Sequence, residues 1–366
     1  MLHWALDHGD LWLAVDSRRD GLTCGGLRLD PRGSADDARE LARLMSLKLA
    51  VCHVPIGGAK ALLAPRAGAD RTAVLAQAGR ALAEHLRGGY LLGEDLGTAA
   101  ADVVAIYEAA EVDPVALVRE RLRGQGRDVV PEGLVLTDLM NDEFAGQLAG
   151  AGAAVALRAA AQAAHLDLAG ATVAVQGFGT VGAAAAAQLA TAGLSVRTVA
   201  DAEHAVHVPD GLAVQELLAM RSDGGRIDVG AAPDRSTVRA SSAWTDWPVD
   251  VVVPAATARS VDEDTARRLA GARFVLEAAN GPLTEDAERV LETAGVVVLP
   301  DIVVNAGSAV AFGLLATGEA TVDDVGERYV ERIVLAIERA WAQGDGSQLR
   351  RHALREAADV LAGTAS

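Results

Sequence analysis

Lys48 and Lys60 are the only two lysines in this chain of 366 residues, in which lysine and arginine together number 33. Arginine stays charged under ordinary conditions, whereas a lysine can lose its proton when burial removes it from water. Because arginine serves at nearly every other cationic position, these two positions are candidates for sites that need a compact or titratable amine. Such a pair could hold an acid group with one fixed positive charge and accept a proton with the other, neutral amine. The alternative is that both are ordinary solvated surface residues.

The residues before Lys48 predict that it projects from the apolar face of a helix. Ser34 and Asp37 have the spacing of a capping box and predict a helix over residues 35–50. Leu44 lies one turn before Lys48 on the same face. A lysine in an apolar stripe costs free energy unless it is paired or lines a cleft. This placement favours a functional site.

Three further residues have both a functional and a structural interpretation. Lys60 follows Pro-Ile-Gly-Gly-Ala, where missing side chains let a ligand approach the backbone. Asp95 alone is typical of a turn or a helix entry, but beside a lysine it could move protons. Asn280 follows a predicted strand, at the strand end where doubly wound sheets bind ligands, although Asn before Gly is also a common turn.

A glycine-rich segment predicts a dinucleotide site. Residues 177–182 read Gly-Phe-Gly-Thr-Val-Gly, between a predicted strand over 172–176 and a predicted helix over 181–192. In this pattern the glycines permit a tight turn, close approach of the pyrophosphate and close packing of helix on strand. The phosphates then meet the N–H groups of the helix N-terminus. Asp201 ends the next strand, where a carboxylate binds ribose and repels a 2′-phosphate, so NAD is favoured over NADP; the alternative is a turn aspartate.

Composition limits the classes of protein. Hydrophobic residues make up 51% of the chain and aromatic residues 3%, so the cores must consist of Ala, Val and Leu. The net charge of −17 argues against partners such as nucleic acid or an anionic membrane. Cys24 and Cys52 give no disulfide framework, and no signal peptide or membrane span is apparent. We expect a cytoplasmic protein without a metal site.

The hydrophobic pattern predicts an α/β protein with two domains. Roughly the first 130 residues mix strands and helices, whereas the chain from residue 171 alternates them as in a parallel sheet covered by helices. The predicted strands are 11–15, 26–29, 171–176, 194–200, 250–254, 274–278 and 296–299. The predicted helices are 35–50, 71–85, 99–110, 149–164, 181–192, 322–343 and 349–362.

Together these segments resemble the glutamate/leucine/phenylalanine/valine dehydrogenase superfamily of amino-acid dehydrogenases. Several motifs in the family's order are more specific than any one alone. The resemblance implies that Lys48 holds the substrate α-carboxylate, Lys60 is the catalytic base and Asp95 moves protons. The similar stretches are residues 24–28, 45–48, 55–60, 94–98, 177–182, 277–282 and 300–307.

The reaction that the resemblance implies is NAD-dependent oxidative deamination. Hydride leaves the amino-acid Cα, and water activated by neutral Lys60 attacks the resulting imine. Ammonia and a 2-oxo acid are then released, and the reverse reaction is a reductive amination. Lys60 must therefore have a lowered pKa; we expect burial and the positive charge of Lys48 to lower it, while Asp95 opposes them.

The resemblance also implies how the chain is organised. An α/β substrate domain over residues 1–145 is completed by returning helices of 320–366, and a Rossmann-type domain over 146–319 binds NAD. Closure of a cleft excludes water, and the chain forms a homo-oligomer. With Lys48, the substrate site would include Gly25, Gly26, Met45, Gly93, Ala309 and Phe312. The cofactor site would include Gly177, Phe178, Gly179, Thr180, Val181, Gly182, Asp201, Ala255, Asn280 and Asn305.

The chain departs from the family pattern at positions that bear on activity and substrate. Ala149 stands where family members usually have a Thr that orients the nicotinamide, and Gln147 or Ser308 could compensate. Ala309 and Phe312 stand where glutamate enzymes have Val and Ser, so we expect a hydrophobic, aromatic or branched, L-amino acid as substrate. The alternatives are a glutamate dehydrogenase-like enzyme and a catalytically impaired NAD-binding paralogue.

Overall fold

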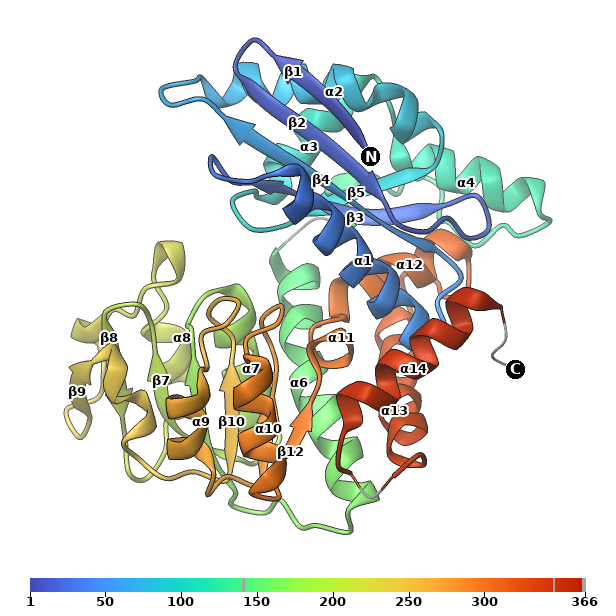
Figure 1. Ribbon diagram of the computed structural model, residues 1–366. Coiled ribbons are helices and arrows are strands. Elements are labelled where there is room, and N and C mark those ends of the chain that lie inside the picture. Colours follow the sequence, from blue (N-terminus) through green and yellow to red (C-terminus); the bar gives the residue numbers. More distant parts are fainter. Residues whose placement is uncertain (140–141, 345, 364–366) are drawn as a thin grey trace. The chain divides into compact units, whose positions relative to one another are not determined.

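The computed structural model describes residues 1–139, 142–344 and 346–363. Its contacts divide the chain into two compact units. The first consists of Met1–Ala145, Ser308–Tyr329 and Ala357–Ser366, and the second of Gly146–Gly307 and Val330–Glu356. Each unit contains one sheet accompanied by helices, which confirms the predicted α/β class (Figure 1).

In the first unit, the described residues form a sheet of five strands in the order β1-β2-β4-β3-β5. β3 pairs in parallel with β4 and β5, whereas β2 pairs antiparallel with β1 and β4. The strands are β1 (Leu2–Leu6), β2 (Gly9–Val15), β3 (Thr23–Leu29), β4 (Gly57–Pro65) and β5 (Tyr90–Glu94). The helices are α1 (Ala35–Val51), α2 (Arg71–Arg87), α3 (Ala100–Ala110), α4 (Pro114–Gly124), α5 (Leu136–Leu139) and α12 (Gly307–Thr317).

The two faces of this sheet pack against different helices. Ala61 and Leu63 of β4 belong to the core that includes residues of α2 and α3, whereas Leu62 packs with Ala38 of α1. Since side chains alternate along a strand, Lys60 points to the same face as Leu62. β4 is not predicted from the sequence, because a strand buried on both faces lacks the alternation that reveals a strand. The edge strand β5 is not predicted either.

The second unit contains a larger sheet, whose described strands have the order β12-β11-β10-β6-β7-β8-β9. The five strands from β12 to β7 are parallel, and β8 and β9 extend the sheet antiparallel. The strands are β6 (Thr172–Gln176), β7 (Ser195–Ala200), β8 (His204–His207), β9 (Thr237–Ala240), β10 (Val251–Pro254), β11 (Phe274–Leu276) and β12 (Val297–Leu299). The helices are α6 (Asp142–Ala163), α7 (Thr180–Thr191), α8 (Val214–Ala219), α9 (Glu263–Leu269), α10 (Glu285–Thr293), α11 (Asp301–Val304), α13 (Val325–Trp341) and α14 (Leu349–Ala362).

The C-terminal helices are shared between the units. Residues 330–356 pack with the second unit, whereas the sequence predicts that 320–366 complete the first domain. Arg350 contributes to this difference, because it forms ion pairs with carboxylates of the second unit. The assignment of 1–145 and 146–319 to substrate and NAD stays a prediction.

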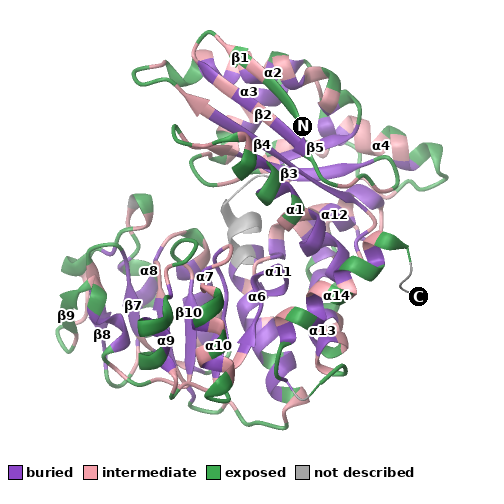
Figure 2. Cartoon of the chain, viewed as in Figure 1, coloured by how far each residue is buried: buried purple, intermediate pink, exposed green. Residues whose placement is uncertain are grey.

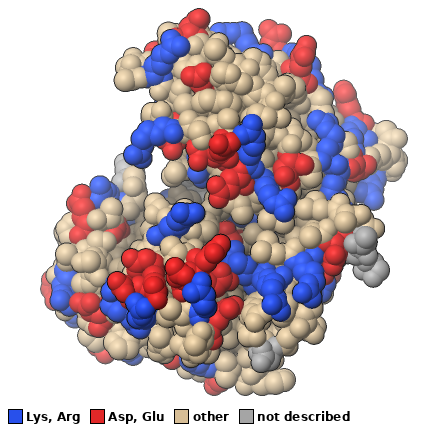
Figure 3. Space-filling view, viewed as in Figure 1, with Lys and Arg blue, Asp and Glu red and all other residues tan. Residues whose placement is uncertain are grey.

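Ala, Val and Leu dominate both cores, as the composition predicts. Figure 2 shows the central strands of both sheets as buried. On the face in Figure 3, acidic and basic side chains are interspersed. Among the helices of the described residues, none combines the length and the apolar character that crossing a membrane requires.

Candidate functional site

Lys60, Asp95 and Arg28 form an ion-pair cluster in the first unit. Lys60 Nζ lies 3.1 Å from Asp95 Oδ2, and Arg28 Nε donates to the same oxygen at 2.7 Å. The three side chains come from β4, from the residue after β5 and from β3, which are neighbours in the sheet. The Asp95 N–H donates to Thr98 Oγ1 at 2.9 Å, and this hydroxyl donates to the Leu27 carbonyl at 2.8 Å. These bonds fix the turn that presents Asp95 to Lys60.

The charges of this cluster explain its protonation. Burial lowers the pKa of Lys60 because it disfavours the ammonium; Arg28 adds to the lowering, and Asp95 opposes it. Burial alone would raise the pKa of Asp95, but Lys60 and Arg28 hold it at about 2. The sequence predicts Lys48 as the cation beside Lys60; the structure places Arg28 there, on the adjacent strand. An ionised carboxylate is thus in contact with an amine that releases its proton readily.

Both lysines are buried, so the interpretation of solvated surface lysines is wrong. Lys48 has 5% and Lys60 4% of its surface exposed. The predicted capping box begins α1 at Ser34. Gly58 lets α1 contact β4 closely, because a Cβ at Gly58 would lie 2.1 Å from the backbone nitrogen of Ser46. Lys48 and Lys60 each follow this contact by two residues, so both lie near the packing of α1 on β4.

An apolar pocket lies beside β5, the edge strand of this sheet, and its lining includes residues of both faces. The register of β3 with β4 and β5 places Cys24 and Gly93 on the face of Lys60, whereas Leu92 lies on the other face. A Cβ at Gly93 would meet no atom within 4 Å, so the strand opens there into space. Cys24 and Gly93 line the pocket together with Phe312 of α12, and none of the described lining residues is charged. Burial raises the pKa of the Cys24 thiol to about 11, while nearby Lys60 opposes the shift.

The other predicted substrate residues lie on β3, α1 and α12, and none of them is among the described residues that line the pocket. Gly25 and Gly26 let β3 pack closely, because a Cβ on them would lie 1.7 Å and 2.4 Å from carbonyl oxygens of neighbouring strands. Met45 and Ala309 are half-buried on α1 and α12, and Ala309 is not among the described residues that line the pocket. Cys24 is a lining residue that the sequence analysis does not assign, although it begins a stretch that resembles the family.

In the second unit, residues 177–182 form the predicted strand–turn–helix connection. Gly177 has a φ of +90°, and a Cβ at Gly182 would lie 1.9 Å from the Gly177 carbonyl oxygen. Gly179 caps α7 without a side-chain hydrogen bond, and a Cβ there would meet no atom within 4 Å. Phe178 is fully buried and anchors the turn. A Cβ at Gly225 would lie 3.0 Å from the Gly179 Cα, so the chain at Gly225 approaches this turn from another side. The N-terminus of α7 suits the pyrophosphate of a dinucleotide. The remaining residues of the loop, Thr180 and Val181, begin α7.

Three more predicted cofactor residues lie at the carboxyl edge of this sheet. Ala255 follows β10, and its backbone would lie 2.7 Å from a Cβ at Gly177. Asn280 follows β11. Asn305 follows α11, and its Nδ2 donates to the Ala278 carbonyl at 2.7 Å. Ligands of doubly wound sheets bind at this edge, so these residues fit a dinucleotide site.

Asp201 follows β7 as predicted, but its carboxylate already accepts hydrogen bonds from the chain. The backbone N–H groups of Glu203, His204 and Ile227 each donate to it at 2.7 Å. Its side chain is 1% exposed. Burial would raise its pKa, and these hydrogen bonds lower it. Asp201 therefore organises its own loop, and its contact with ribose stays a prediction.

The departure at Ala149 stays untested. The side chains of Ala149 and Gln147 lie outside the described residues, and Ser308 is half-buried in the first turn of α12.

Comparison with known proteins identifies two matching sequence families. The profile described as Glutamate/Leucine/Phenylalanine/Valine dehydrogenase matches residues 144–362. The profile described as Glu/Leu/Phe/Val dehydrogenase, dimerisation domain, matches residues 11–111.

Similar individual proteins carry glutamate dehydrogenase names. The chain is 36% identical over 290 residues to the NADP-specific glutamate dehydrogenase A1 of Halobacterium salinarum, covering 77% of this chain and 66% of that protein. It is 31% identical over 308 residues to a glutamate dehydrogenase of Aeropyrum pernix, covering 82% and 69%. The chain thus spans about two thirds of the length of these relatives. The solved hetero-hexameric glutamate dehydrogenase of Thermus thermophilus, in a Leu-bound form, is similar with a TM-score of 0.78 and 26% identity, covering 97% of this chain and 84% of that one.

Proposed function

Because the chain belongs to the Glu/Leu/Phe/Val dehydrogenase family, we propose that it is a nicotinamide-dependent L-amino-acid dehydrogenase. It converts an L-amino acid to the 2-oxo acid and ammonia, and it catalyses the reverse reductive amination. The observation that carries the proposal is the buried ion pair of Lys60 and Asp95 in the unit that holds the apolar pocket. A lysine with a lowered pKa beside an ionised carboxylate suits a general base.

Each side chain of the first unit has its own task in this reaction. When bound, the cofactor supplies the acceptor for the hydride of the substrate Cα. Lys48 pairs with the substrate carboxylate. Neutral Lys60 takes a proton from water while the water oxygen bonds to the imine carbon. Asp95 and Lys60 then pass a proton from the new hydroxyl to the nitrogen, the C–N bond breaks, and ammonia leaves a 2-oxo acid.

The pocket supports an apolar side chain on the substrate. Its described lining residues carry no charge, and they include the aromatic Phe312 as well as Gly93, where a Cβ would meet no atom within 4 Å. A side-chain carboxylate of the substrate, such as that of glutamate, would be buried in this pocket without a cation. Burying it would cost several kcal/mol, on the order of the penalty for an unpaired buried charge. We therefore propose a branched or aromatic L-amino acid.

Glutamate is the second candidate substrate. The similar curated proteins carry glutamate dehydrogenase names, and this similarity favours glutamate more than an apolar amino acid.

The choice of nicotinamide cofactor is a separate part of the proposal. The position of Asp201 after β7 supports NAD, whereas two similar proteins are named as NADP-specific or NADP(+)-dependent. Because the Asp201 carboxylate is occupied by backbone N–H groups, both cofactors must be compared.

The remaining parts of the proposal concern organisation. The first unit carries the substrate residues and the second carries the cofactor residues. We propose a homo-oligomer; the hetero-hexameric assembly of a similar protein supports oligomer formation, although its subunits are not all alike. A cytoplasmic location agrees with two buried free cysteines.

A substrate panel tests the proposal. L-Amino acids with NAD or NADP, and 2-oxo acids with ammonia and NADH or NADPH, are followed by the absorbance of the reduced nicotinamide. A higher kcat/KM for leucine, valine or phenylalanine than for glutamate supports the first candidate, and the opposite order supports the second. NADH binding without turnover of any compound would identify a catalytically impaired paralogue.

A further inference from the structure

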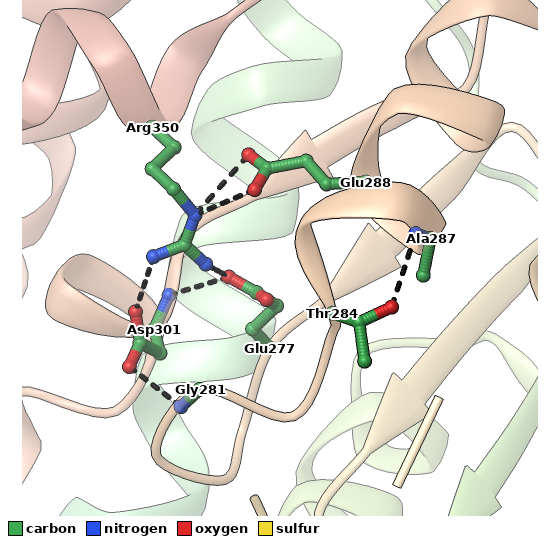
Figure 4. Close-up of polar contacts among 7 residues, drawn as sticks. All are labelled: Glu277, Gly281, Thr284, Ala287, Glu288, Asp301 and Arg350. Atoms are coloured by element: carbon green, nitrogen blue, oxygen red, sulfur yellow. Dashed lines mark hydrogen bonds and ion pairs between the residues drawn. The ribbon is translucent and has the colours of Figure 1, made fainter. Parts of the chain in front are cut away.

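Arg350 of α14 contacts three carboxylates of the second unit (Figure 4). Its Nε donates to both oxygens of Glu288 at 3.1 Å, and its Nη1 donates to Asp301 Oδ1 at 3.0 Å. Its Nη2 donates to Glu277 Oε2. One guanidinium therefore holds three carboxylates that come from separate segments of the chain.

This cluster lies where the sheet presents its cofactor residues. Glu277 directly follows β11, and Asp301 follows β12 by two residues. The second oxygen of Asp301, Oδ2, accepts the N–H of Gly281 at 2.9 Å. Because Gly281 follows Asn280 directly, the chain of contacts runs from Arg350 through Asp301 to the loop that carries Asn280.

Glu277 joins the two strand ends to each other. Its Oε2 accepts the Asp301 N–H at 3.0 Å as well as the Arg350 donor. Its side chain is 0% exposed, and within the described residues its Oε1 has no hydrogen-bond partner. A buried carboxylate that lacks one partner depends strongly on the charge that faces its other oxygen. Arg350 supplies that charge.

We propose that Arg350 is a positioning residue for the nicotinamide cofactor, because its hydrogen bonds to Asp301 and Glu277 hold the Asn280–Gly281 loop in its binding conformation. This inference rests on the proposed dehydrogenase function. Arg350 itself touches neither substrate nor cofactor. Its loss should weaken cofactor binding on the order of 10-fold or more, because small displacements of binding groups are costly. The KM for the amino acid should change far less, because the predicted substrate residues lie in the first unit.

The test uses the full-length protein with the variants Arg350→Met, Arg350→Met/Glu277→Gln and Arg350→Lys. Arg351→Ala is the matched control, since Arg351 is an exposed neighbour on the same helix. For each protein, the dissociation constants of NADH and NADPH are measured by fluorescence, the amino-acid KM by steady-state kinetics, and Tm by calorimetry. Hydrogen exchange is followed in peptides that cover residues 277–284.

The double variant separates positioning from stability. Removing the Glu277 charge relieves the unpaired buried carboxylate, so Tm should recover toward that of the unmodified protein. We expect the cofactor dissociation constant to stay raised and exchange in 277–284 to stay fast, while Arg350→Lys recovers part of both and Arg351→Ala changes neither. Cofactor binding that recovers together with Tm would overturn the proposal. An unmodified protein that binds neither NADH nor NADPH would instead refute the proposed function, and this inference with it.

Discussion

Lys60 and Arg28 share one oxygen of Asp95, at 3.1 Å and 2.7 Å. Two cations therefore face one carboxylate, and the buried lysine is the member of the trio that can give up its proton. In the resting site this relationship gives Arg28 a fixed positive charge, Asp95 an ionised carboxylate and Lys60 a titratable amine.

Replacing Lys60 with Met should remove the base, and the site can hold the methionine side chain in place of the lysine. We expect kcat to fall roughly 10²- to 10⁴-fold, which is typical for the loss of a general base. NADH binding should be retained, because the predicted cofactor residues lie in the second unit. Arg28→Lys is the control, since it keeps a cation beside Asp95. Activity of Lys60→Met near that of the unmodified protein would contradict the assignment.

Removing the Asp95 charge should move the pH profile. Deamination requires neutral Lys60, so kcat should rise with pH as Lys60 loses its proton. Asp95 raises the pKa of Lys60, so Asp95→Asn should shift the rising limb of the kcat–pH profile to lower pH. The maximal kcat should fall at the same time. The measurement is kcat against pH for both proteins. A limb that moves to higher pH would show that Asp95 does not stabilise the ammonium.

Gly93→Val should narrow the pocket. A Cβ at Gly93 meets no atom within 4 Å, so the strand can accept valine while the side chain fills pocket space. For a bulky substrate we expect kcat/KM to fall about 10-fold or more relative to a small one, in line with steric discrimination in apolar pockets. Gly93→Ala should give an intermediate effect. An equal loss for alanine and phenylalanine would mean that this pocket does not hold the substrate side chain.

The charge cluster at Arg350 predicts a pH dependence of stability. Burial, together with the carboxylates of Glu292, Asp301 and Glu285, raises the pKa of Glu288 to about 7. The folded protein therefore binds this proton more tightly than the unfolded chain does. The resulting stabilisation is complete below the unfolded pKa, and it is lost as the pH rises through about 7.

Glu288→Gln should remove this dependence. We expect its free energy of unfolding to vary less between pH 5 and pH 8 than that of the unmodified protein, by roughly 1–3 kcal/mol, and urea unfolding measures it. Glu40→Gln, which removes an exposed carboxylate of the first unit that does not act on Glu288, is the control. Parallel pH profiles for the unmodified protein and Glu288→Gln would contradict the raised pKa.

The features that could be predicted from sequence are mostly local. The capping box at Ser34 and the turn at Gly177 depend on residues a few positions apart, and the structure confirms both. Lys48 and Lys60 could be selected because the composition made them rare. β4 could not be predicted, because it is buried on both faces and therefore lacks the alternation of apolar and polar residues that reveals a strand.

The contacts that could not be predicted from the sequence join residues that lie far apart in the chain. Arg28 reaches Asp95 across 67 positions, and Asp201 is bonded to Ile227 across 26. Arg350 contacts Glu277 across 73 positions. Nothing in the local pattern around these residues specifies such partners, since they follow from strand order and helix packing.

The most direct test of the account is the pKa of Lys60 in the intact protein. With only two lysines in the chain, lysine-selective isotope labelling gives one Nζ signal for each, and Lys60→Arg assigns them. An NMR titration should place the pKa of Lys60 clearly below the ordinary value of a lysine, and Asp95→Asn should lower it further. A Lys60 that titrates at or above the ordinary value would contradict its role as a neutral base.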